Sequence, residues 1–465
     1  MDDQDAHRAE RRVAASKGRD SKPQELRTEA QRDRDRILYS YEFRRLAHVT
    51  QVVSESETQL FHNRLTHSLK VAQIARRMAE RLLRMTDPAT VRAAGGLEAD
   101  VAESAALAHD LGHPPFGHMA EKQLQKLVKS KDYPGSSAPD SFEGNAQTFR
   151  IVCKLAFRST REGEPALNLT RATLNGILKY PWMFGEHPKP RYEDKWGAYK
   201  SEASDFKFAR DGVTHAEQSL EAEIMDFADD VSYAVHDVED FFRAGMIPLD
   251  RMRAGGAEAD SFLDYVIHQL AREGDPEDTF TKEECETAFE QVSSYAFLSE
   301  PYDGSRQHRE ALNKVASDLL TIFLAPVTIS EVGRLNIPRT VRSQVAVLKQ
   351  LTWRYVIDNP ALAMTQEGQR NVITTLYEIL CDLVNQAAAK PSMEVRLPRL
   401  LREQLGAVRT DQEALAEYEA DDEVLRTRAV IDYISSLTER QAVDLFRRTT
   451  GSGLALSALE PWLTA

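Results

Sequence analysis

The sequence has few cysteines and no long apolar run. Its three cysteines, Cys153, Cys285 and Cys381, are scattered over 465 residues. That number and spacing exclude a disulfide framework and a zinc-thiolate site, and we expect buried free thiols. No stretch approaches the roughly 20 apolar residues that span a bilayer, and the N-terminus is charged rather than signal-like. We therefore expect a cytoplasmic protein without membrane contact.

The chain also lacks an excess of basic residues. It has 59 Lys and Arg against 73 Asp and Glu, so its formal net charge is −14. Such a protein does not attract polyanions through its overall charge. A nucleotide ligand would have to meet a local cluster of Arg and Lys, helped by a metal ion.

Strictly alternating runs of β-branched residues are almost absent, and helical patterns dominate. Apolar residues recur every three or four positions over 64–84, which predicts one amphipathic helix, and similar patterns continue to residue 448. We predict an all-α fold with three parts. Residues 1–36 are charged and form a mobile arm, 37–245 form a catalytic core, and 246–465 form a helical C-terminal extension that completes the fold and supplies oligomer contacts.

The loop predicted at 181–214 is long for a compact domain, and such loops are usually functional or mobile. It contains Lys195, Trp196, Tyr199 and Lys200. These residues suit a lid over an anionic ligand, although a solvated surface loop explains them equally well.

The stretch from His109 to His118 is the most informative part of the sequence. It contains three of the twelve histidines and an aspartate, Asp110, next to His109. A helix that breaks at Gly112 allows both neighbours to turn toward one divalent cation, which accepts mixed imidazole and carboxylate ligands. The alternative is a set of loop histidines that cap helix ends.

Two further positions favour the metal site. His67 begins the amphipathic helix at 64–84, and Asp229 and Asp230 lie inside an apolar helical segment. Buried carboxylates need a cation or hydrogen-bond donors. Either aspartate is a candidate ligand; we favour Asp229, because Asp229, Tyr233 and Asp237 would share one helix face.

The order His, His-Asp, Asp resembles the HD superfamily of metal-dependent phosphohydrolases, and the local sequences resemble its dNTP triphosphohydrolases, the dGTPase-like family. The matching stretches cover about 40–240. They are 43–46, 50–51, 62–68, 109–118, 142–150, 167–170, 178–181 and 228–237.

This resemblance implies an HD-domain helical bundle that removes triphosphate from a deoxynucleoside triphosphate by water attack at the α-phosphorus. It implies one divalent ion per subunit and a catalytic histidine, His118, that Glu121 orients. A mixed imidazole and carboxylate shell would suit Mn, Mg, Fe or Co, and of these we expect Mn or Mg. The residues implied to bind the metal are His67, His109, Asp110 and Asp229. Those implied or expected to bind substrate are Arg64, Lys195, Lys179 and His113 at the phosphates, and Gln51, Tyr233 and Asp237 at the sugar.

Other interpretations remain open at this point. The same metal site could serve a nucleoside monophosphate or a cyclic phosphodiester, or the chain could bind a dNTP or single-stranded nucleic acid without turnover. The basic residues of the N-terminal arm are interleaved with acidic ones, so they support nucleic-acid binding poorly. The resemblance also implies a homo-oligomer, a tetramer or hexamer, and allows a second dNTP as effector.

Overall fold

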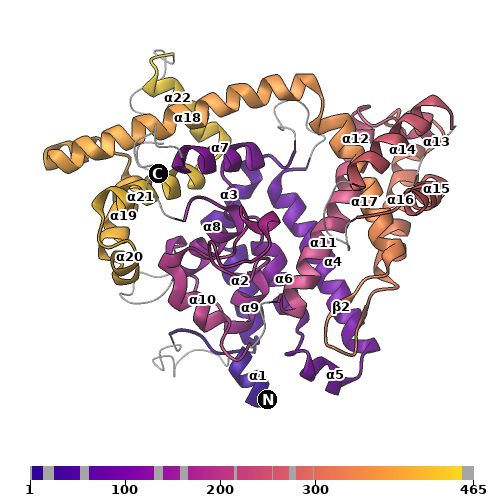
Figure 1. Ribbon diagram of the computed structural model, residues 1–465, viewed down its shortest axis with the longest axis horizontal. Coiled ribbons are helices and arrows are strands. Elements are labelled where there is room, and N and C mark those ends of the chain that lie inside the picture. Colours follow the sequence, from indigo (N-terminus) through magenta and orange to yellow (C-terminus); the bar gives the residue numbers. More distant parts are fainter. Residues whose placement is uncertain are drawn as a thin grey trace.

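The computed structural model describes residues 3–13, 26–52, 62–129, 140–157, 166–213, 217–253, 255–271, 279–296 and 298–452. Helices are the main secondary structure of the described residues (Figure 1), which confirms the predicted all-α class. The exception is one short antiparallel pair, β1 (Thr328–Ile329) and β2 (Leu335–Asn336). No helix in these ranges is both long and apolar enough to cross a membrane.

Four helices form the centre of the predicted catalytic half. Helix α4 packs against α6 and α11, and α9 packs against α6. Small residues on α6, such as Ala102, Ala105 and Ala106, are fully buried and let neighbouring helices approach closely. These four helices are α4 (Arg64–Met85), α6 (Ala99–Ala108), α9 (Arg171–Ile177) and α11 (Leu220–Ser232).

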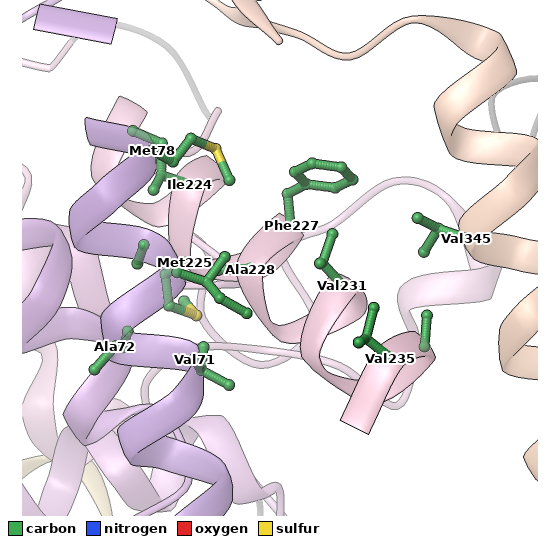
Figure 2. Packing of buried hydrophobic residues seen from close by; sticks show 14 of the residues in the cluster. Val71, Ala72, Met78, Ile224, Met225, Phe227, Ala228, Val231, Val235 and Val345 are labelled. Atoms are coloured by element: carbon green, nitrogen blue, oxygen red, sulfur yellow. The ribbon is translucent and has the colours of Figure 1, made fainter. Parts of the chain in front are cut away.

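The interface between α4 and α11 is apolar and carries two of the candidate metal ligands. Figure 2 shows side chains of both helices meeting there, and the apolar face of α11 continuing toward α17 (Arg339–Thr352). The labelled residues are Val71, Ala72 and Met78 on α4, Ile224, Met225, Phe227, Ala228 and Val231 on α11, Val235 just beyond it, and Val345 on α17. This packing fixes His67 and Asp229 relative to each other.

Shorter elements surround these four helices. Several of them lie in the loop that we predicted at 181–214, so that segment is more helical than expected. The elements are α1 (Asp3–Arg8), α2 (Glu29–Leu38), α3 (Tyr41–Arg45), η1 (Leu46–His48), α5 (Pro88–Ala93), α7 (Gly117–Lys129), α8 (Gly144–Arg150), η2 (Ile151–Leu155), η3 (Pro190–Tyr192), η4 (Lys200–Glu202), α10 (Ala203–Ala209), η5 (Tyr233–Asp237), α12 (Val238–Arg243), α13 (Leu249–Arg253) and α14 (Ala257–Leu270).

The N-terminal segment differs from the solvated arm that we expected for 1–36. In its described parts, 3–13 and 26–36, Arg8 pairs with the buried Glu221, and Arg11 pairs with the buried Asp33. Arg36 also donates to the carbonyl of Asn168. Because buried ion pairs attach this segment in addition to the apolar packing of Ala30, its low apolar content was a poor guide.

The C-terminal half includes the helix α18, which runs along one side of the molecule with α7 beneath it (Figure 1). Helices α12 to α17 lie toward one end of α18, and α19 to α22 lie toward the other. The remaining elements are α15 (Lys282–Ala296), α16 (Arg306–Leu324), η6 (Trp353–Ile357), α18 (Pro360–Ala389), η7 (Pro391–Arg396), α19 (Arg399–Thr410), α20 (Gln412–Glu417), α21 (Asp422–Ser436) and α22 (Glu439–Thr449).

The apolar core does not divide at residue 245. One cluster of buried residues extends from Ile37 to Val356, and a second joins α7 to helices α18 to α22. Residues 246–356 therefore complete the core of the catalytic half, whereas α18 to α22 build a core of their own beside α7.

A buried ionic network joins the two halves. The guanidinium of Arg150 lies 2.6 Å from a carboxylate oxygen of Glu202 and 2.8 Å from one of Asp432, and all three side chains are buried. Gln147 donates to the same Asp432 at 2.9 Å. Burying charges is tolerated only when they are paired and hydrogen-bonded. The network thus fixes α21 against α8, next to the candidate site.

Candidate metal centre and its cavity

The end of α6 places His109 and Asp110. His109 Nδ1 lies 2.7 Å from the carbonyl of Ala106, so the ring donates there and turns Nε2 toward the cavity. Gly112 is required just beyond, because a Cβ would lie 2.1 Å from the carbonyl oxygen of Gly144 on α8. Thr148 then accepts from Gly112 N and donates to the His109 carbonyl. The close approach of α8 to Gly112 therefore fixes the positions of His109 and Asp110.

His67 and Asp229 complete the cluster from α4 and α11. His67 Nε2 lies 2.9 Å from Asp229 Oδ1, and His109 Nε2 lies 3.7 Å from the same oxygen. The potential ligand atoms of His67, His109 and Asp110 all lie within 4.8 Å of one another. His109 Nε2 is buried without a hydrogen-bond partner among the described residues. An unpartnered imidazole nitrogen beside two carboxylates fits a divalent cation.

Asp229, rather than Asp230, faces this cluster. Asp230 instead accepts from the ammonium of Lys349 at 2.6 Å. Although burial alone would raise the pKa of Asp229, its hydrogen bond with His67 and the charge of Lys179 hold that pKa below the ordinary value. The carboxylate is therefore charged, as a metal ligand must be.

Arg64 lies directly beside the cluster. Its Nη1 is 2.8 Å from Asp110 Oδ2, and its Nε donates to the carbonyl of Thr50 at 3.1 Å. The remaining nitrogen, Nη2, is buried and has no hydrogen-bond partner among the described residues. A Cβ at Gly117 would lie only 2.9 Å from this nitrogen, so the glycine leaves space beside it. Arg64 can thus donate to an anionic ligand.

The start of α7 contributes His118 and Glu121. His118 Nδ1 lies 2.9 Å from Glu121 Oε2; His118 is 68% exposed and Glu121 is buried. Burial alone would raise the pKa of Glu121, but the charges of Lys195 and His118 hold this pKa well below its usual range. The pair leaves His118 Nε2 for proton transfer.

His113 lies between this pair and the metal cluster. Its Nδ1 is 3.0 Å from Asp110 Oδ1, and burial together with the charge of Arg64 lowers its pKa to about 4. With His118 and Glu121 it forms a second group of potential metal ligands. The ammonium of Lys195, 3.3 Å from Glu121, disfavours a second cation there.

Both lysines expected at the phosphates are neutralised by carboxylates. Lys195 lies 3.1 Å from Glu143 as well as 3.3 Å from Glu121, and Lys179 lies 2.7 Å from Asp226. Both reach the cavity, but neither carries uncompensated charge.

The three expected sugar contacts have different outcomes. Tyr233 and Gln51 line the cavity, and Gln51 Oε1 is buried without a partner among the described residues. Asp237 is only 3% exposed and does not line the cavity. We predicted regular α-helical spacing from Asp229 to Asp237, but Tyr233–Asp237 form a π-helical turn, η5. Burial and the charges of Asp240 and Asp229 raise the pKa of Asp237.

Most of these groups line one cavity of about 850 Å³, whereas His67, Glu121 and Asp237 do not line it. Its far wall comes from residues that the sequence analysis missed, on η6 and the first turns of α18. A signal for Lys122 and Lys126 was present in the sequence, because they lie four and eight residues after His118 on α7. The missed lining residues include Lys122, Lys126, Tyr180, Lys349, Trp353, Ile357, Leu362, Thr365, Gln366 and Arg370.

Comparison with known proteins agrees with the motif order. Residues 64–234 match the HD domain, and residues 335–448 match a phosphohydrolase-associated domain. The chain is 35% identical to a deoxyguanosinetriphosphate triphosphohydrolase-like protein of Streptomyces coelicolor, over 91% of this chain and 93% of that one. A protein of the same name from Bordetella parapertussis is 31% identical, over 92% and 91% of the two chains.

Proposed function

The chain belongs to the HD-domain family of deoxyguanosinetriphosphate triphosphohydrolase-like proteins, and on that premise we propose that it hydrolyses deoxynucleoside triphosphates to deoxynucleoside and inorganic triphosphate. The observation that carries this proposal is one cavity lined by His109, Asp110 and Asp229, by Arg64 and His118, and by Tyr233. Charge-binding, proton-transfer and aromatic groups thus lie within reach of one nucleotide.

The metal cluster suits one divalent ion, for which we propose Mn or Mg. His67, His109, Asp110 and Asp229 would hold it, as two imidazoles and two carboxylates. Such an ion, when bound, activates water and neutralises charge on a phosphoryl oxygen.

Arg64 and His118 have separate roles in the proposed reaction. Arg64 Nη2, which has no partner among the described residues, donates to an α-phosphate oxygen and holds the phosphorus near the metal cluster. The oxygen of water bonds to the α-phosphorus, and the bond from that phosphorus to the 5′ oxygen breaks. His118, when protonated and oriented by Glu121, gives its proton to the departing 5′ oxygen.

At the other side of the cavity, we propose that Tyr233 packs beneath the sugar and that Gln51 bonds its 3′-hydroxyl. A ribose would place its 2′-hydroxyl against an aromatic ring without a hydrogen-bond partner, which costs binding energy. Asp237 does not line the cavity, and its contact with the sugar stays a prediction. The oligomeric state, a dNTP effector and the cytoplasmic location stay predictions.

The product distinguishes this reaction from other HD-domain chemistry. The protein is incubated with each dNTP and each rNTP in Mn or Mg, and the products are separated by chromatography. We expect deoxynucleoside and inorganic triphosphate. Pyrophosphate with a monophosphate, or no turnover of any dNTP mixture, would overturn the proposal.

A further inference from the structure

The cations that line the cavity differ in how far they are neutralised. Seven Lys and Arg side chains line it, and five of them are paired with carboxylates: Arg64, Lys179, Lys195, Lys349 and Arg370. Within the described part of the chain, Lys122 and Lys126 have no ion-pair partner. These two lysines therefore carry the uncompensated positive charge of the cavity wall.

Their positions relate them directly to the catalytic pair. Lys122 and Lys126 follow His118 by four and eight residues on α7, so the three side chains lie along one helix face. All three are exposed and all three line the cavity. Gln123 donates to Thr374 on α18 at 2.8 Å, which holds α7 in place against that helix.

We propose that Lys122 and Lys126 form the subsite for the β- and γ-phosphates, in both the substrate and the triphosphate product. This inference rests on the proposed function, under which a triphosphate chain extends from the metal cluster within the cavity that these lysines also line. A chain of several negative charges gains most from cations that have no carboxylate already bound. Lys179 and Lys195, which the sequence suggested for these phosphates, instead hold the carboxylates around the reacting groups.

A binding experiment tests the lysines without turnover. Inorganic triphosphate is titrated by calorimetry into the full-length, metal-loaded protein and into Lys122→Ala, Lys126→Ala and the double variant. We expect each single change to weaken triphosphate binding about fivefold and the double change roughly tenfold or more, since a partly exposed charge contact contributes on the order of 1 kcal/mol. Inorganic phosphate binding should change less than twofold.

Lys129 provides a matched control on the same helix. It is exposed, pairs with Asp194 at 2.7 Å and does not line the cavity. Lys129→Ala should bind triphosphate as the wild type does, and Lys122→Arg with Lys126→Arg should retain most of the affinity. Equal affinity in the double alanine variant and the wild type, or an equal loss in Lys129→Ala, would overturn the subsite.

Kinetics separate this inference from the function on which it rests. If dNTPs are hydrolysed, the double alanine variant should raise KM for a dNTP with little change in kcat, because contacts made equally in ground and transition state affect binding alone. A loss of kcat at unchanged KM would contradict the subsite but not the activity. If the wild type hydrolyses no dNTP, the proposed function fails, and the triphosphate titration still decides whether these lysines bind the anion.

Discussion

His67 Nε2 lies 2.9 Å from Asp229 Oδ1, although 162 positions separate the two residues in the chain. The next residue, Asp230, is bound to Lys349 outside the cluster. Asp229→Ala should therefore lose bound metal and turnover, whereas Asp230→Ala should keep nearly the wild-type metal content. Metal per chain is measured by mass spectrometry after dialysis. Equal metal content in Asp229→Ala and the wild type would refute the ligand assignment.

His118 should affect turnover without affecting metal binding. Removing a general acid typically lowers kcat by about 10²- to 10⁴-fold, and we expect a loss in this range for His118→Ala, with a smaller loss for Glu121→Gln. Both variants should retain metal. His268→Ala, which changes an exposed histidine on α14, serves as the control. If His118→Ala kept its full kcat, the acid would have to be another group.

Arg150 should matter for stability rather than chemistry. Its replacement by Met leaves the buried carboxylates of Glu202 and Asp432 without their guanidinium. Breaking a buried pair in this way costs about 3–5 kcal/mol of unfolding free energy. Arg399→Met, which removes an exposed pair with Glu403, should cost less than about 1 kcal/mol. Urea unfolding measures both, and similar costs would mean that the buried network contributes little.

Sequence patterns were sufficient to predict the all-α class, because helix periodicity can be read from the spacing of apolar residues. The local motifs were sufficient to predict that His67, His109 and Asp110 lie close together. They failed at the N-terminus, where Arg8 and Arg11 attach the segment through buried ion pairs that no apolar pattern reveals. The π-helical turn at Tyr233–Asp237 also leaves no signature in the residue spacing.

The far wall of the cavity could not be predicted for a different reason. Trp353 and the first turns of α18 come more than 100 residues after the last recognised motif, and only the tertiary packing of α17 and α18 brings them to the cavity. Similarly, sequence identifies Lys179 and Lys195 as cations but does not reveal their carboxylate partners. Only the three-dimensional structure shows that carboxylates neutralise Lys179 and Lys195, and that Lys122 has no such partner among the described residues.

Glu284 gives a pH-dependent contribution to stability. Hydrogen bonds from Arg339 and from the backbone of Thr281 lower its pKa from 4.5 to about 2 in the folded protein. The charged Glu284 carboxylate therefore stabilises the folded protein fully above pH 4.5, and this contribution is lost as the pH falls toward 2. Glu284→Gln should unfold at lower urea than the wild type at pH 7, and the difference should shrink at pH 4 and 3. Glu283→Gln, at an exposed neighbour, is the control. A difference that stayed constant with pH would contradict this origin.

Tyr233 should determine the preference for deoxyribose. The ring lines the cavity beside Asp229, and a wall without a hydrogen-bond acceptor penalises a 2′-hydroxyl by about 1–3 kcal/mol. Tyr233→Ala should therefore lower the ratio of kcat/KM for a dNTP to that for the matching rNTP by roughly 10- to 100-fold. Tyr233→Phe keeps the ring and should keep the ratio. If the alanine variant discriminates as well as the wild type, the ring does not exclude ribose, and the selection must come from contacts to the 3′-hydroxyl or the base.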